Sequence, residues 1–178
     1  MWKKIIFIFG TILIYLIICF AIYESFNKPQ TKKITTTLPE KLTTPITKDK
    51  PIGNLIINRI NLNEELYPID SIENNIEKHV TILKHSEDPK VENSTIFIAA
   101  HSGTGKIAYF KDLDKLTIND QIILKYKNNT YTYKIKNIWE DKKTGSISIP
   151  KENKKQLVLT TCSPTKDQYQ LIINSIQI

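Results

Sequence analysis

The architecture of this chain follows from the stretch Leu157-Val158-Leu159-Thr160-Thr161-Cys162. A second stretch of similar character, Ile96-Phe97-Ile98-Ala99-Ala100, ends directly before His101, and Cys162 follows that histidine by 61 positions. Short apolar runs of this kind are typical of buried strands. A thiol and an imidazole at the ends of two predicted strands are the parts of a cysteine nucleophile and its proton partner.

Burial without a chemical role is the usual state of a free cysteine, so the context of Cys162 decides its interpretation. It precedes Ser163-Pro164 and therefore borders a loop, where functional groups collect on a rigid scaffold. The other histidines, His79 and His85, do not follow apolar strands, and we interpret them as surface residues. Gln170 begins a predicted strand that runs back beside the cysteine strand, and its amide can donate hydrogen bonds.

The rest of the chain from residue 52 onward predicts more short strands with brief helical interruptions. A hairpin is predicted by two apolar runs around an asparagine-containing turn at residues 127–129, with Tyr131, Tyr133 and Ile135 alternating with polar residues. We expect strands at 52–62, 95–100, 121–126, 130–139, 157–161 and 170–178. A short helix is predicted at 71–84, where Ile72, Ile76 and Val80 recur at helical spacing, and one or two helical turns at 109–116 would place Phe110, Leu113 and Leu116 together. This pattern predicts an all-β fold, a closed or nearly closed barrel.

Composition excludes several classes of function. The net charge is +7, but Arg59 is the only arginine and the lysines are spread along the chain, which argues against nucleic-acid binding. The five glycines do not form a nucleotide-binding loop. The histidines and Cys162 lack the spacing of zinc ligands, so we predict neither a metal site nor a cofactor.

The N-terminal part predicts attachment to a membrane. Residues 5–23 carry no charge, and a helix of that length rises ~28 Å, close to the thickness of the bilayer interior. We therefore expect an uncleaved single-pass anchor at residues 1–26, a polar stalk at 27–51 and a folded domain at 52–178. The short tail before a single span favours a domain outside the cell membrane.

With these elements in place, the chain resembles the sortase family of cysteine transpeptidases. The family signature Thr-Leu-x-Thr-Cys at the end of a barrel strand is matched by Val158-Leu159-Thr160-Thr161-Cys162, except at its first position. The histidine motif is matched by Ile98-Ala99-Ala100-His101, followed by a glycine-containing loop and by Phe110-Lys111-Asp112-Leu113-Asp114-Lys115-Leu116. The resemblance covers roughly residues 52–178 and implies an eight-stranded sortase-type barrel after one transmembrane helix.

The resemblance also implies an activity and its partners. Cys162 would attack a peptide bond in the sorting signal of a surface protein, and His101 would protonate the leaving amine. The acyl group would pass to an amine of a cell-wall precursor or a pilin, without a cofactor. Thr161, before the nucleophile, is expected to bind substrate. At the position of the family arginine the chain has Gln170, which can supply hydrogen bonds but no charge.

Two other functions stay open at this stage. The missing arginine favours a non-catalytic relative that binds peptide or supports pilus assembly. A cell-wall amidase with a papain-like site is disfavoured, because in that group the cysteine usually precedes the histidine and often begins a helix. Here His101 precedes Cys162, and both follow predicted strands.

Overall fold

A computed structural model describes residues 49–178, so the predicted anchor and nearly all of the predicted stalk lie outside the described residues. The folded part contains eight strands and two short 3-10 helices. The strands are β1 (Gly53–Ile57), β2 (Leu62–Leu66), β3 (Thr81–Ile82), β4 (Thr95–Ala99), β5 (Gln121–Tyr126), β6 (Asn129–Lys142), β7 (Gln156–Cys162) and β8 (Tyr169–Gln177), and the helices are η1 (Asn58–Ile60) and η2 (Leu113–Lys115).

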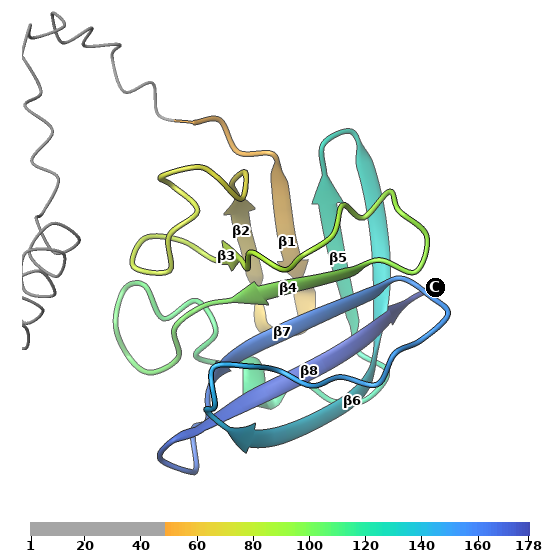
Figure 1. The fold of residues 1–178 in the computed structure, drawn as a ribbon. Coiled ribbons are helices and arrows are strands. Elements are labelled where there is room, and N and C mark those ends of the chain that lie inside the picture. Colours follow the sequence, from red (N-terminus) through yellow and green to blue (C-terminus); the bar gives the residue numbers. More distant parts are fainter. Residues whose placement is uncertain (1–48) are drawn as a thin grey trace, which may run out of the picture. The chain divides into compact units, whose positions relative to one another are not determined.

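All strands belong to one sheet in the order β2-β1-β5-β6-β8-β7-β4-β3, which curls into a nearly closed barrel (Figure 1). The predicted all-β barrel is thereby confirmed for the described part of the chain. Within residues 49–178 there is no helix with the length and apolar character needed to cross a membrane.

The one parallel pairing among these strands joins β4 to β7, which lie side by side in Figure 1. Its register pairs Thr95 with Gln156 and Ala99 with Thr160, a constant offset of 61 positions. On its other side β7 pairs antiparallel with β8, where Cys162 lies opposite Gln170. The strand that ends in the cysteine is therefore held on both sides.

The barrel interior is filled by the inward side chains of the strands. The predicted hairpin is confirmed as β5 and β6, and Tyr131, Tyr133 and Ile135 are all buried. Its turn is tighter than predicted: Lys127, not an asparagine, takes the positive φ of 52°. Gly53 permits the close approach of β1 to β5, because a Cβ there would lie 1.9 Å from the carbonyl oxygen of Lys125.

The helix predicted at residues 71–84 is wrong. That segment forms successive turns and then β3. The side chain of Asn74 accepts from the backbone N–H of Ile82 at 2.8 Å and donates to its carbonyl at 2.9 Å, which holds the segment in a compact loop. An asparagine that bonds backbone in this way competes with helical hydrogen bonds.

Two other expectations need smaller corrections. The strand predicted at 52–62 is divided by η1 and a left-handed residue, Asn61 (φ 53°), so that the chain reverses and β2 pairs with β1. The helical turns predicted at 109–116 are reduced to η2, but Phe110, Leu113 and Leu116 are all buried in the core as their spacing suggested.

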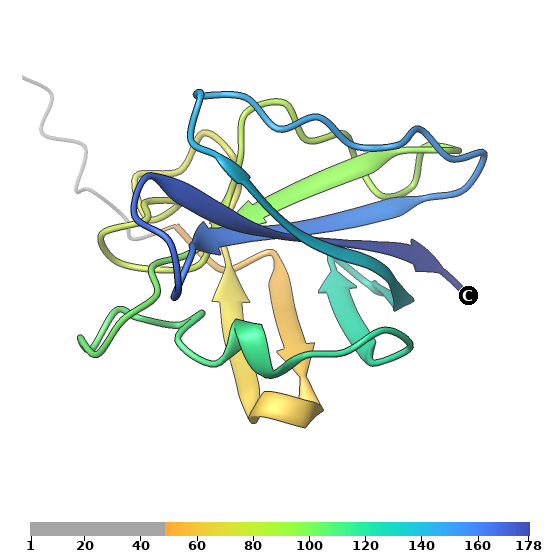
Figure 2. The same cartoon turned by 90° about the horizontal axis from the view of Figure 1, so that it is seen from below.

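The connection from β6 to β7, residues 143–155, is named the strap here. Figure 2 shows it running along the side of β4, β7 and β8 that faces away from β1, β2 and β5. Its middle is held by Gln156, whose amide donates to the carbonyl of Pro150 at 2.9 Å and accepts from the N–H of Glu152 at 3.2 Å. Glu152 also forms an ion pair with Lys136 of β6. The strap therefore covers the outer face of the strands that carry the predicted site.

Candidate active site

The ends of β4 and β7 bring His101 and Cys162 to the same edge of the sheet. Continued by two residues, the parallel register that pairs Ala99 with Thr160 sets His101 beside Cys162. Neighbouring strands lie about 4.8 Å apart, so the two backbones are adjacent. The hydroxyl of Ser102 donates to the carbonyl of Cys162 at 3.1 Å, which connects the chains beyond the last paired residues.

The imidazole of His101 is oriented by a carboxylate. Its Nε2 lies 3.1 Å from Oε1 of Glu77, and its side chain is about one-third exposed (34%). This contact engages Nε2 and leaves Nδ1 as the free ring nitrogen. Glu77 belongs to the loop that the sequence predicted as a helix, so no pattern placed it near His101.

The thiol of Cys162 is exposed, and a lysine lies against it. Nζ of Lys143 donates to Sγ of Cys162 at 3.0 Å. Lys143 directly follows β6, and its backbone N–H donates to the carbonyl of Gln168 in the β7–β8 connection at 2.9 Å. Sequence reasoning missed this residue, because one lysine in a lysine-rich chain carries no distinguishing signal.

Gln170 lies beside Cys162, but both ends of its amide are engaged within the protein. Its Nε2 donates to the carbonyl of Ser146 in the strap, and its Oε1 accepts from the hydroxyl of Thr160, each at 3.4 Å. Gln170 and Thr160 line a cavity of about 460 Å³ together with Phe97 and strap residues that include Ile147. A partly apolar cavity between the sheet and the strap therefore adjoins Gln170, the residue opposite Cys162.

Thr161 is directed away from that cavity. By alternation it shares the face of β7 with the core residues Leu157 and Leu159, and it is buried. Its hydroxyl donates to the carbonyl of Ala100 at 2.8 Å. The position of this side chain gives it a role in joining the ends of β4 and β7, and does not support the substrate contact expected from the sequence.

The connection after Cys162 is organised by one carboxylate. Glu140 of β6 accepts from the hydroxyls of Ser163 and Thr165 and forms an ion pair with Lys166 at 3.0 Å. The hydrogen bond from Ser163, followed by that from Lys166, holds the pKa of Glu140 below its ordinary value. The Glu140 carboxylate therefore holds the connection between β7 and β8, which begins directly after Cys162.

Comparison with known proteins now identifies the fold. The family model described as the sortase domain matches residues 55–175, more than half of the chain. The chain belongs to the sortase family. This confirms the resemblance drawn from the Cys162 and His101 motifs. Among curated protein sequences no relative matches.

Solved sortase structures share the fold of this sortase domain. Sortase C1 from Streptococcus agalactiae is 26% identical, with a TM-score of 0.63 over 72% of this chain and 67% of that chain. Sortase A from Corynebacterium diphtheriae, a lid mutant, is 21% identical, with a TM-score of 0.64 over 76% of this chain and 75% of that chain. Sortase C from Streptococcus pneumoniae is 22% identical, with a TM-score of 0.63 over 72% and 68%.

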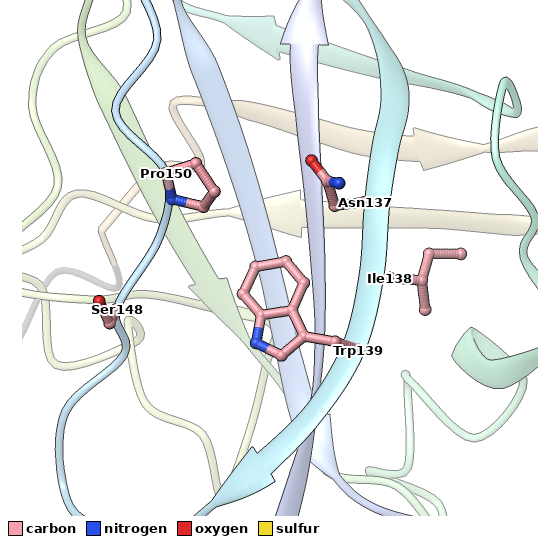
Figure 3. A pocket seen from close by; sticks show the side chains of 5 residues that line it. All are labelled: Asn137, Ile138, Trp139, Ser148 and Pro150. Carbon is pink, nitrogen blue, oxygen red and sulfur yellow. The ribbon is translucent and has the colours of Figure 1, made fainter.

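A second cavity lies between β6 and the strap. It measures about 470 Å³ and is lined by residues of β6 and of the strap, Trp139 and Pro150 among them. Figure 3 shows Trp139 and Asn137 directed to the same side of β6, and Ile138 to the other. A bulge at Lys136 resets the alternation of β6, so Ile138 packs on the core and the tryptophan faces the strap.

The sortase domain offers no evident metal site in its described part: residues 49–178 contain no group of three or more His, Cys, Asp or Glu side chains that could hold an ion.

Proposed function

We propose that this sortase domain is an active cysteine transpeptidase that cleaves sorting-signal peptides of surface proteins and transfers the acyl group to an amine. The observation that carries the proposal is the parallel register of β4 and β7, which aligns the chain positions of His101 and Cys162. The cavity lined by Thr160 and Gln170 beside that edge supports it further. Members of the family are generally cysteine transpeptidases.

The reaction follows from the chemistry of the two groups. The lone pair of the Cys162 thiolate forms a bond to the carbonyl carbon of the scissile peptide, and the carbonyl π electrons move to oxygen. Collapse of this oxyanion restores the carbonyl and expels the amine, which takes a proton from the His101 imidazolium. An incoming amine, from a cell-wall precursor or a pilin lysine, then attacks the thioester and gives its proton to the neutral His101. Cys162 leaves as the thiolate, which restores the starting thiolate and imidazolium.

The cavity between the strap and the sheet suits the apolar part of an extended peptide. Phe97 and Ile147 supply apolar surface from opposite sides, and the hydroxyl of Thr160 and the amide of Gln170 supply polar groups nearest the cysteine. A few polar groups in a mainly apolar pocket fix the orientation of a ligand. We place the residues of the sorting signal that precede the scissile bond in this cavity.

The decisive experiment is mass spectrometry of the full-length protein in detergent after incubation with a panel of sorting peptides. We expect an acyl adduct on Cys162, and a transfer product when an amine acceptor is added. Cys162→Ala should abolish both, and His101→Ala should lower the rate by on the order of 10²–10⁴.

Matched controls are available in the chain. Cys19→Ala removes the other cysteine, and His79→Gln removes a histidine whose Nε2 lies 3.5 Å from Glu73 instead of near the thiol. Both variants should retain wild-type cleavage. Cleavage by the Cys162→Ala protein at the wild-type rate would refute the nucleophile assignment.

A second candidate function is a peptide-binding scaffold without acyl transfer. It is favoured by the neutral Gln170 at the position of the family arginine. A scaffold would bind the sorting peptide with unchanged affinity after Cys162→Ala and would never form the adduct. Peptide binding without an adduct in the wild-type protein would therefore select this alternative.

We further propose that residues 1–26 anchor the protein as a single span, with the sortase domain outside the cell. The uncharged stretch at residues 5–23 supports this arrangement. A membrane-impermeant amine reagent applied to intact cells should label lysines of residues 52–178. Labelling of these lysines only after the cells are opened would reverse the orientation.

A further inference from the structure

We propose that Lys143 is a catalytic residue that supplies the positive charge missing at Gln170. This inference rests on the proposed function and names the group that stabilises negative charge, first on the sulfur and then on the substrate oxygen. Its basis is the contact of 3.0 Å between Nζ of Lys143 and Sγ of Cys162.

The position of Lys143 is set by the fold and not by its side chain alone. Lys142, the last residue of β6, pairs with Tyr169 of β8, and the next N–H, that of Lys143, donates to the carbonyl of Gln168. Its Cα is therefore anchored to the chain segment that leaves the cysteine strand. The flexible stem has only to reach from this anchor to the sulfur.

The charge of Lys143 is not neutralised by a carboxylate. Among the ion pairs of residues 49–178, none includes Lys143, whereas Lys166 nearby is paired with Glu140 at 3.0 Å. The only arginine, Arg59, lies in η1 after β1, and β5 and β6 separate β1 from β8 in the sheet. Within residues 49–178, Lys143 is the basic residue whose side chain contacts Sγ of Cys162.

Gln170 cannot perform this task in the arrangement observed. It carries no charge, and its amide is used to join Ser146 of the strap to Thr160 of β7. The two residues thus have separate roles. Gln170 holds the strap, and Lys143 provides the positive charge from the start of the strap. A cation beside a thiol favours the nucleophilic thiolate.

The Lys143 ammonium can also stabilise the oxyanion that forms in the next step, and it keeps its proton throughout. When the thiolate bonds to the carbonyl carbon, negative charge passes from the sulfur to the carbonyl oxygen. This oxygen is bonded to the same carbon as the sulfur. An ammonium 3.0 Å from the sulfur is close enough to interact with that oxyanion. Removing one such donor typically lowers the rate by roughly 10²–10³.

The first test measures the thiol alone and needs no substrate. In the full-length protein, alkylation of Cys162 by iodoacetamide is followed by peptide mass spectrometry, which separates it from Cys19. Lys143→Met, which keeps the stem and removes the charge, should slow alkylation several-fold near neutral pH, and Lys143→Arg should largely retain the rate. Lys142→Met, an exposed neighbour of equal charge, should have no effect.

The second test measures turnover and relocates the charge. Lys143→Met should lower kcat for sorting-peptide cleavage by roughly 10² with a much smaller change in KM. Adding Gln170→Arg to that variant should recover most of the loss, whereas Gln170→Arg alone should give a smaller gain. Recovery by a charge placed at a second position is not expected of a lysine that only stabilises the fold.

Three results would overturn the inference: equal alkylation of the Lys143→Met and Lys142→Met proteins, unchanged kcat in Lys143→Met, or an acyl group found on the Lys143 amine, which requires a neutral lysine. If no peptide is cleaved at all, the proposed function fails, but the alkylation rates still decide whether Lys143 charges the site.

Discussion

The two faces of β7 are both buried, but they are covered by different kinds of structure. Leu157 and Leu159 face the barrel core and pack among apolar side chains from other strands. Val158 and Thr160 face outward and are covered by the strap, which the sheet holds through the side chains of Gln156 and Gln170. Stability therefore resides mainly in the inner face, whereas the shape of the site depends on a few hydrogen bonds at the outer one.

This difference also explains why Leu157, Val158 and Leu159 of the cysteine strand are apolar in succession. A strand with one wet face alternates between apolar and polar residues, whereas one covered on both faces does not. Cys162 is the first exposed residue of β7, because the six residues before it are buried. Substitutions on the two faces should separate folding from function.

The largest expected effect is on the inner face. Leu159→Ala removes a fully buried side chain from the core and should lower the free energy of unfolding by about 2–5 kcal/mol. Denaturant titration of the full-length protein followed by tryptophan fluorescence measures the change. The exposed strap variant Lys154→Ala should leave the midpoint unchanged; a similar loss in both proteins would contradict the assignment of stability to the core.

The next effect concerns the middle of the strap. Gln156→Ala leaves the Pro150 carbonyl, the Glu152 N–H and the Asn174 side-chain oxygen without their partner, and should cost about 1–3 kcal/mol. Hydrogen exchange should become faster in the strap while the β5–β6 hairpin keeps its protection. Gln121→Ala, an exposed glutamine of β5, is the matched control. Unchanged exchange in the strap would show that Gln156 does not hold it.

A smaller effect on stability is expected at the end of the strap near the cysteine. The bonds of Gln170 to Ser146 and Thr160 are both 3.4 Å long, so Gln170→Ala should cost only about 0.5 kcal/mol. The cavity beside Cys162 should become less defined, and KM for sorting peptides should rise more than kcat falls. A loss of stability as large as that of Gln156→Ala would remove the distinction between the two ends.

The smallest effect should appear as a dependence on pH. The folded protein lowers the pKa of Glu140, mainly through the hydroxyl of Ser163 and then Lys166, so this carboxylate stabilises the fold above its unfolded-state pKa. That contribution is lost as the pH falls through the lowered folded-state value. Glu140→Gln should flatten this acid-side part of the stability profile. An identical slope in wild type and variant would exclude the contribution.

The sequence predicts the inner face better than the outer one, for a physical reason. Alternation identified Tyr131, Tyr133 and Ile135 as buried, and the two apolar runs identified the strands of the site. Periodicity reports which side chains avoid water, so it serves well where a core is formed. The contacts of Lys143 and Glu77 depend on loops whose course is set by individual hydrogen bonds, and no periodic pattern records them.

The failed helix at residues 71–84 illustrates the same limit. Its spacing of Ile72, Ile76 and Val80 fitted a helix, but only Val80 is fully buried and Ile72 is exposed. The side-chain amide of Asn74 instead replaces backbone partners of Ile82 and closes a loop. Two such local hydrogen bonds outweigh a weak amphipathic pattern when the segment has little apolar surface to bury.

The pairing of β4 with β7 has a consequence for how this protein can vary. Because the hydrogen-bond ladder aligns the two strand ends, a change of length in a loop between them would leave their register unaltered. A single residue inserted within β7 acts differently: it would rotate everything that follows to the opposite side of the sheet and turn the thiol into the barrel. We therefore expect changes in length to be tolerated in loops and not within β4 or β7.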